Sequence, residues 1–395
     1  MSERIFITGL GAVSPSGLGV GRLWSDLLQG TQRFGPLDKL YAGMRSSTLG
    51  GRVPSDIKSH LLSSSRFGSG AGRRVASAFS EFAALEALRD AGIAAGDPML
   101  DGALVCVGSS DGQADVVERV IAGEIELGSF EGFSSYSIAE DVSDGIGAGG
   151  LAFTAQSTCA SANVALSTAL EMLREGVADV AVVGGCDIYS AKNIIGFSSL
   201  QAIGAEPCKP FSSDRRYVTP SEGAGFLVLQ VEGSLRPSQR VYAELLAVAV
   251  TNDASHPTAP DLGGVTACHE RALREAGIAA ADVDVIYAHG TGSRINDAIE
   301  GSIFVDQYPD AKVTAIKGTI GHLMGAAGAI GAIAACLTLS EGLVPPTVVG
   351  ASPSDPAVNL VVGRSLQLEH PRYVQNNAFG FGGNNAIAIF GSARD

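Results

Sequence analysis

One cysteine in this 395-residue chain has the surroundings of a nucleophile. Cys159 follows the apolar run 151–155 and precedes the segment 163–173, whose apolar residues recur at helical spacing. Its sulfur should therefore lie at a helix N-terminus, where unpaired N–H groups and the helix dipole favour a thiolate. This makes Cys159 a candidate for covalent catalysis. The other five cysteines are predicted to be small buried hydrophobic residues: Cys106, Cys186, Cys208, Cys268 and Cys336.

Two histidines and a lysine lie in glycine-rich segments of the second half of the chain. His289 begins His289-Gly290-Thr291-Gly292-Ser293 at the end of an apolar run, and His322 ends Lys317-Gly318-Thr319-Ile320-Gly321-His322. Histidines next to glycines at strand ends are candidates for a site. The remaining four are predicted to be ordinary surface or core groups: His60, His256, His269 and His370.

The composition narrows the class of protein. Hydrophobic residues at 46% and charged residues at 17% indicate a globular chain with a large core. The net charge of −14 argues against a general nucleic-acid binder, so an acidic partner would need a local basic patch. The cysteines lack disulfide or zinc spacing, which favours a reducing compartment, and the N-terminus is predicted to be a strand and not a signal peptide. We therefore expect a cytoplasmic protein without a metal, and a buried helix, not a membrane span, after His322.

Strands and helices alternate in two similar halves, which predicts a duplicated α/β architecture. The first half is expected to span 1–235 and to carry Cys159 and an inserted cap at 113–150, and the second half to span 236–395. Gly9-Leu10-Gly11 lacks the remaining residues of a dinucleotide fingerprint. The expected strands are 4–8, 104–108, 151–155, 178–185, 226–230, 242–250, 283–288 and 313–316, and the expected helices are 73–88, 163–173, 264–276 and 323–341.

The motifs together identify a family. Thr158-Cys159-Ala160-Ser161, Ala288-His289-Gly290-Thr291, the Lys317–His322 segment and Phe379-Gly380-Phe381-Gly382-Gly383 occur in the order and approximate spacing of a β-ketoacyl-acyl-carrier-protein synthase. The chain resembles the elongating ketosynthases of type II fatty-acid and polyketide systems over nearly its whole length. This resemblance implies a thiolase-like fold with five layers, αβαβα. It also implies a dimer, either a homodimer or a heterodimer with a chain-length-factor-like homologue, in which strand 178–185 pairs across the two-fold axis.

The resemblance also implies a reaction, decarboxylative Claisen condensation with malonyl carried on an acyl carrier protein. Cys159 would hold the acyl chain, and His289 and His322 would donate hydrogen bonds to the malonyl thioester oxygen. The N–H groups of Cys159 and Phe381 would form the acyl oxyanion hole, with Gly382 giving the loop its freedom. Other implied roles are catalysis for Lys317, substrate contacts for Thr291, Ser293 and Phe379, and carrier-protein contacts for Arg73 and Arg74. No cofactor is implied beyond the phosphopantetheine of the carrier.

The chain departs from the family pattern at four places. Gly331 replaces the Glu that pairs with Lys317, and the loop 209–218 lacks the usual Asp and Gly residues. The cap is short, and Asp111 occupies the usually apolar position that gates a saturated acyl chain. A carboxylate there would need polar neighbours such as Ser109 and Ser110. We therefore expect Asp111 to line the acyl tunnel of a specialised enzyme with a polyketide-type substrate, for example a polyene.

Three other functions remain open. A non-condensing chain-length-factor-like subunit typically lacks the nucleophilic cysteine, whereas this chain has Cys159 and both histidines. A housekeeping fatty-acid ketosynthase would lack the departures above. A thiolase acting on coenzyme A esters is disfavoured by the two-histidine arrangement and by the missing second catalytic cysteine near the C-terminus.

Overall fold

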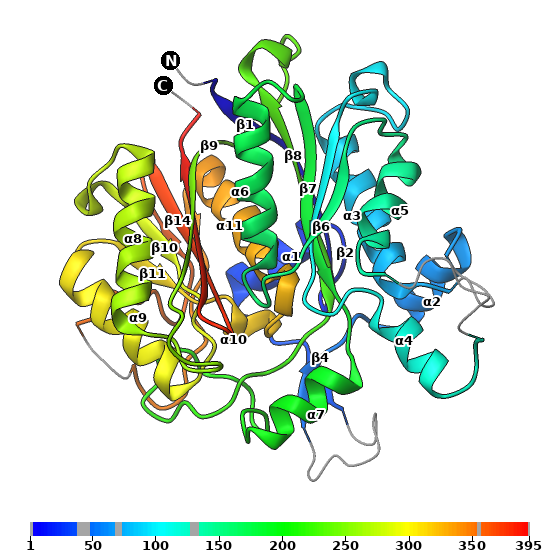
Figure 1. Cartoon of the computed structure of the whole chain (residues 1–395). Coiled ribbons are helices and arrows are strands. Elements are labelled where there is room, and N and C mark those ends of the chain that lie inside the picture. Colours follow the sequence, from blue (N-terminus) through cyan, green and yellow to red (C-terminus); the bar gives the residue numbers. More distant parts are fainter. Residues whose placement is uncertain (1–2, 38–47, 68–72, 127–133, 354–356, 394–395) are drawn as a thin grey trace.

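The largest element of the fold is a long mixed β-sheet (Figure 1). The computed structural model describes residues 3–37, 48–67, 73–126, 134–353 and 357–393. In this part of the chain eleven strands join in the order β11-β10-β14-β15-β9-β1-β8-β7-β5-β6, with β2 beside β1. The strands are β1 (Ile5–Ser14), β2 (Gly17–Leu18), β5 (Leu104–Gly108), β6 (Ala152–Ala155), β7 (Val180–Asp187), β8 (Gly223–Val231), β9 (Ala243–Asn252), β10 (Val285–Tyr287), β11 (Lys312–Thr314), β14 (Tyr373–Gly380) and β15 (Asn384–Gly391).

The sheet consists of two halves that face each other across a central helical layer. The halves join where β1 pairs with β9. Among the described residues this junction has two pairs, Phe6 with Glu244 and Ile7 with Ala243. The helices α6 (Ser161–Arg174) and α11 (Ala327–Glu341) fill the space between the halves (Figure 1). The outer faces are covered by α3 (Val75–Asp90) and α5 (Ser137–Ile146) on one side, and by α8 (Leu262–Ala276) and α9 (Arg294–Gln307) on the other. This confirms the predicted thiolase-like, five-layer fold.

Small elements surround the two ends of this body. The short helices are α1 (Val20–Gln29), α2 (Ser55–Ser64), α4 (Ala114–Ile121), α7 (Ala191–Ser199) and α10 (Lys317–Ile320). Two-stranded sheets pair β3 (Phe34–Pro36) with β4 (Leu49–Gly51), and β12 (Leu343–Val344) with β13 (Leu366–Gln367). In the predicted cap at 113–150, α5 packs against α3 and β6, so it belongs to the outer layer of the fold.

The central layer is built from small residues that let its helices approach closely. A Cβ at Gly328 of α11 would lie 2.6 Å from Oδ1 of Asn163 in α6. The segment Met324–Glu341 is long and apolar enough to cross a membrane, but 83% of it is buried inside the protein. It is therefore a core helix, as the sequence predicts.

The position of β7 differs from the expectation for a dimer. β7 is hydrogen-bonded to β8 on one side and to β5 on the other, so it offers no free edge. The edge belongs to β6, which pairs only with β5 among the described strands and whose four residues are all half-buried. A continuous apolar run indicates burial on both faces of a strand, but it does not reveal how many neighbours the strand has.

Candidate active site

Cys159 lies in a tight turn between β6 and α6. The hydroxyl of Ser161 closes this turn, because it accepts from the N–H of Ser157 at 2.9 Å and donates to the carbonyl of Thr158 at 2.6 Å. Thr158 has a φ of 50°, which is uncommon for a β-branched residue and marks a constrained turn. Cys159 therefore directly precedes the first turn of the helix, as the sequence predicts.

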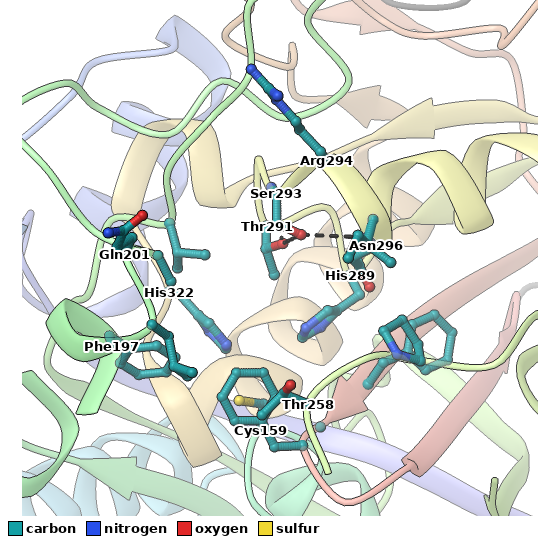
Figure 2. A pocket seen from close by; sticks show the side chains of 18 of the residues that line it. Cys159, Phe197, Gln201, Thr258, His289, Thr291, Ser293, Arg294, Asn296 and His322 are labelled. Carbon is teal, nitrogen blue, oxygen red and sulfur yellow. Dashed lines mark hydrogen bonds between the residues drawn. The ribbon is translucent and has the colours of Figure 1, made fainter. Parts of the chain in front are cut away.

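A cavity of about 350 Å³ opens above this turn and collects most of the predicted site residues (Figure 2). Seven of them line it: Cys159, His289, Thr291, Ser293, His322, Phe379 and Phe381. Lys317 lies behind His289, whereas Asp111, Arg73 and Arg74 are not among the lining residues. The cavity thus brings the cysteine and both histidines together from opposite halves of the sheet.

The glycine-rich segment after β14 approaches the cysteine turn very closely. The hydroxyl of Thr158 donates to the carbonyl of Phe381 at 3.1 Å. A Cβ at Gly380 would lie 2.1 Å from Thr158 Oγ1 and 3.1 Å from the backbone nitrogen of Cys159. Gly382 has a φ of 80°, a conformation that glycine adopts without strain. The Phe381 ring lies 5.7 Å from the Phe197 ring and is 37% exposed, so it borders the cavity instead of filling the core.

His289 and His322 are neutral hydrogen-bonding groups. Their ring centroids are 5.3 Å apart at an interplanar angle of 86°, and both residues are buried. Burial, together with the positive charge of Lys317, lowers both imidazole pKa values well below 6.5. Phe379 packs against His289 with 5.7 Å between the ring centroids, which fixes the imidazole plane. The pair can therefore donate hydrogen bonds without carrying charge.

Lys317 determines which nitrogen of His289 can donate. Its ammonium donates to the carbonyl oxygen of His289 and lies 3.4 Å from Nδ1 of the same residue. An ammonium has no acceptor, so Nδ1 accepts and the hydrogen is on Nε2. Burial lowers the pKa of Lys317 from 10.5 to about 8, and Glu300 opposes this shift. The lysine thus assigns the donor nitrogen of His289.

Glu300 is the important residue that the sequence analysis missed. Its carboxylate accepts from the N–H of His289 at 2.8 Å and of Gly290 at 2.7 Å, and from Nδ2 of Asn296 at 2.8 Å. Burial raises its pKa to about 7. The spacing of Asp297 and Glu300 was the available signal, because residues three apart share one face of a helix that begins beside the His289 motif.

The space expected for a glutamate at position 331 is filled differently. A Cβ at Gly331 would lie 2.1 Å from Oδ1 of Asn376, so no larger residue fits there without movement. The Asn376 amide donates to the carbonyl of Gly328 at 2.8 Å. Lys317 therefore has its carboxylate counterpart in Glu300 on α9 and not in α11.

The expected thiolate at Cys159 is not the resting form. Enclosure by the cavity walls raises the Cys159 pKa to about 12, although Lys317 opposes the shift. Asp187 and Asp111 add to the increase through their negative charges. Desolvation of the sulfur outweighs the helix dipole, so Cys159 is a thiol at neutral pH.

Three predicted contact residues lie elsewhere. The Asp111 side chain is 1% exposed and pairs with Lys192 and the hydroxyl of Ser190, so it neither lines the cavity nor depends on Ser109 and Ser110 side chains. Arg74 forms an ion pair with Asp141 at 3.0 Å, which makes it a structural residue more than a free docking group. Arg73 is exposed at the start of α3.

The unusual loop 209–218 contributes to the mouth of the cavity. Lys209 pairs with Asp214 at 2.8 Å, and the N–H of Phe211 donates to Asp297 at 2.8 Å. Arg216 lines the cavity, as does Arg294 from the start of α9. Figure 2 shows Arg294 at the opposite end of the lining from Cys159. The changed loop thus places a positive side chain at the mouth.

Comparison with known proteins decides the family. The family model of the β-ketoacyl synthase N-terminal domain matches residues 2–233. The family model of the C-terminal domain matches residues 242–350. The chain belongs to the β-ketoacyl synthase family. This β-ketoacyl synthase is 31% identical to nodulation protein E of Rhizobium meliloti (strain 1021), with 99% of each chain covered. It is 29% identical to 3-oxoacyl-[acyl-carrier-protein] synthase 2 of Staphylococcus aureus (strain N315), with 98% of each covered.

Solved structures show the same relationship. "The ishigamide ketosynthase/chain length factor" is 30% identical with a TM-score of 0.88, and 99% of this chain and 100% of that chain are covered. A chain of "AntDE:AntF (apo): type II PKS acyl-carrier protein in complex with its ketosynthase bound to the hexaketide" is 25% identical with a TM-score of 0.83 over the full length of both chains. The protein is therefore an acyltransferase-type condensing enzyme by family.

Proposed function

We propose that this β-ketoacyl synthase condenses an acyl chain held on Cys159 with a malonyl unit carried by an acyl carrier protein. The observation that supports this proposal is the shared cavity of Cys159, His289 and His322. The Cys159 sulfur attacks the incoming thioester, and the carrier leaves as a thiol that takes up the sulfur's proton. N–H groups of Cys159 and Phe381 then stabilise the oxyanion of this transfer.

The second half of the reaction uses the histidines. The malonyl thioester loses its carboxyl group as CO₂, and the electron pair moves onto the thioester oxygen. His289 donates to this oxygen from Nε2, and His322 supplies a second donor. The resulting enolate carbon attacks the Cys159 thioester, so that a C–C bond forms while the C–S bond breaks. The free sulfur regains a proton, and the carrier keeps the β-ketoacyl product.

The experiment that tests this function uses Cys159→Ala. We expect the variant to keep its fold, to lose acylation by an acyl carrier protein, and to lose condensation. Intact-mass spectrometry detects the acyl-enzyme directly. Persistent acylation of the variant would refute the role of Cys159. Absence of acylation in the native protein, tested with both carrier-protein and coenzyme A thioesters, would favour the non-condensing subunit.

The substrate is proposed to be of polyketide type. Support comes from the whole-chain similarity to a chain of "The ishigamide ketosynthase/chain length factor" and from the charged pair of Asp111 and Lys192, where an apolar gate is expected. Because the carboxylate is paired, its influence on the acyl chain is indirect. Loading of saturated and polyunsaturated acyl carrier proteins can be compared in the native enzyme and in Asp111→Ile. A native preference for saturated chains that this substitution leaves unchanged would contradict the proposal.

The carrier protein is proposed to dock at the mouth of the cavity. Arg216 and Arg294 are exposed there, next to the exposed apolar residues Leu200 and Ile295. In a chain of net charge −14, such a local positive pair favours an acidic partner. Arg294→Glu should weaken carrier binding more than Arg73→Glu, because only Arg294 lines the cavity. Equal effects of the two substitutions would contradict docking at the cavity mouth alone and would support a contact at the start of α3.

A dimer is proposed to form through the edge of β6. Leu151 is 59% exposed and Tyr136 50% exposed beside this edge, and an uncovered strand invites pairing with a second chain. The partner is either a second copy or a chain-length-factor-like homologue. All six cysteines are free, which supports our proposal that the enzyme acts in the cytoplasm.

A further inference from the structure

A chain of buried polar side chains leads from Glu300 into the outer layer of the second half. Asn377 Nδ2 donates to Glu300 Oε1 at 3.3 Å, and Gln375 Nε2 donates to Asn377 Oδ1 at 2.8 Å. The same Gln375 nitrogen lies 3.1 Å from His269 Nδ1, and the Tyr308 hydroxyl donates to Gln375 Oε1 at 3.3 Å. Gln375, Asn377, His269 and Tyr308 are each at most 3% exposed.

The direction of the hydrogen bonds from Glu300 through Asn377 to Gln375 follows from the charge of Glu300. An ionised carboxylate only accepts, so the Asn377 amide must turn its NH₂ group toward Glu300. Its oxygen then faces Gln375, which must present its own NH₂ group. Both hydrogens of that group are used when the second one reaches His269 Nδ1. Burial lowers the His269 pKa to about 3, so the ring is neutral, and its Nδ1, which also lies 3.0 Å from the Tyr308 hydroxyl, can accept.

These polar groups lie among buried apolar side chains. His269 packs against the rings of Phe304 and Phe379 at 6.3 and 6.2 Å, within an apolar cluster between α8, α9 and the sheet. Gln375 lies in β14, between β10 and β15, and shares a sheet face with Asn377 because side chains alternate along a strand. Buried amides stabilise a fold only when they are satisfied, and the Gln375 amide is satisfied by Asn377 on the side of the active site and by His269 and Tyr308 on the other.

We propose that Gln375 and His269 are positioning residues for the malonyl half of the reaction. They hold the Asn377 amide in the orientation that keeps Glu300 ionised. The ionised Glu300 in turn keeps its hydrogen bonds to the N–H groups of His289 and Gly290. The proposal rests on the proposed condensing function. Neither residue touches the cavity. Their effect passes through Asn377 and Glu300 to the imidazole of His289, and it should spare the acylation of Cys159.

The charges around Glu300 make its ionisation sensitive to this support. Asp297, one turn earlier on α9, raises the Glu300 pKa, while the N–H groups of His289 and Gly290 and the Asn296 amide lower it. Lys317 of α10 faces Glu300, and Arg215 lies 4.0 Å from Asp297. With burial included, the Glu300 pKa is about 7, so at neutral pH a small change in support alters the ionised fraction strongly.

The test compares Gln375→Leu with a matched control, Gln230→Leu. Both glutamines are fully buried in strands, but Gln230 lies in β8 and bonds to Thr8 and Ser234, away from the site. For each variant, two rates are measured between pH 6 and 9: acylation of Cys159 and decarboxylation of malonyl carrier protein. A rise of about one unit in the Glu300 pKa would reduce its ionised fraction at pH 7 about fivefold.

We expect Gln375→Leu to keep acylation within about twofold of native, to lose about fivefold in decarboxylation at pH 7, and to shift the acidic limb of that profile upward by about one pH unit. Partial unfolding would lower both rates together, so the ratio of the two rates reports on positioning. An unchanged ratio and profile, or the same selective loss in Gln230→Leu, would overturn the proposal. Failure of the condensing function itself would appear differently, as absent acylation of the native enzyme.

Discussion

Gly380→Ala tests whether the glycine-rich loop must touch the cysteine turn. The new Cβ would lie 2.1 Å from Thr158 Oγ1, whereas ordinary contacts begin near 3.4 Å, so the loop must retreat by about 1.3 Å (3.4 minus 2.1). Such a shift misaligns the N–H of Phe381 and breaks the hydrogen bond from Thr158 to the Phe381 carbonyl. Loss of one oxyanion donor typically costs about 10²–10³ in rate, or about 2.7–4 kcal/mol.

The assay is the single-turnover rate of Cys159 acylation, followed by intact-mass spectrometry. We expect the variant to acylate about 10²–10³ times more slowly than the native enzyme. The double variant Thr158→Ala with Gly380→Ala should recover at least about tenfold, because the next nearest atoms lie 3.1 Å from the new Cβ. Gly21→Ala is the control, since nothing lies within 4 Å of its Cβ. Native-like acylation by Gly380→Ala, or a double variant no faster than the single one, would refute the reasoning.

Three further outcomes follow from the site. His289→Ala and His322→Ala should each slow decarboxylation by about 10²–10³-fold while acylation of Cys159 persists. Near-normal decarboxylation by either variant would contradict the proposal that this histidine donates to the malonyl thioester oxygen. Because burial lowers the Lys317 pKa to about 8, its proton is lost as pH rises through that value, so a pH–rate profile should fall above pH 8. The unfolded chain keeps this proton up to about pH 10.5, so the free energy of unfolding should rise between about pH 8 and pH 10.5. Lys317→Met should abolish both the fall in rate and the rise in stability. Leu151→Asp should convert the dimer to monomers in light scattering, and an unchanged mass would place the interface elsewhere.

The structure brings the predicted Cys159, His289 and His322 into one cavity, and the sequence could indicate them because each lies in a local pattern. A cysteine between an apolar strand and a helix, and histidines beside glycines at strand ends, are visible within short segments. The layered fold followed from the alternation of strands and helices together with the family resemblance. The helix after His322 could be identified as internal because its glycines and alanines suit close packing.

The failed expectations depended on contacts between distant segments. The free edge of β6 and the interior place of β7 are set by strand order, which apolar runs do not encode. The partners of Asp111 come from the segment 190–192, about eighty residues later in the chain. The thiol state of Cys159 results from a balance in which desolvation by the whole cavity outweighs the local helix dipole.

The missing glutamate at position 331 shows how the site keeps its electrostatic balance. A buried ammonium such as Lys317 needs a nearby negative charge to remain protonated. α11 cannot supply one, because Asn376 occupies the space beside Gly331. Glu300 supplies it from α9, and the same carboxylate also holds the backbone of His289. One residue therefore links the charge of the lysine to the position of the imidazole that the lysine orients. In our proposal, the polar side chains behind Glu300 support the charge that lies beside Lys317 and holds the backbone of His289.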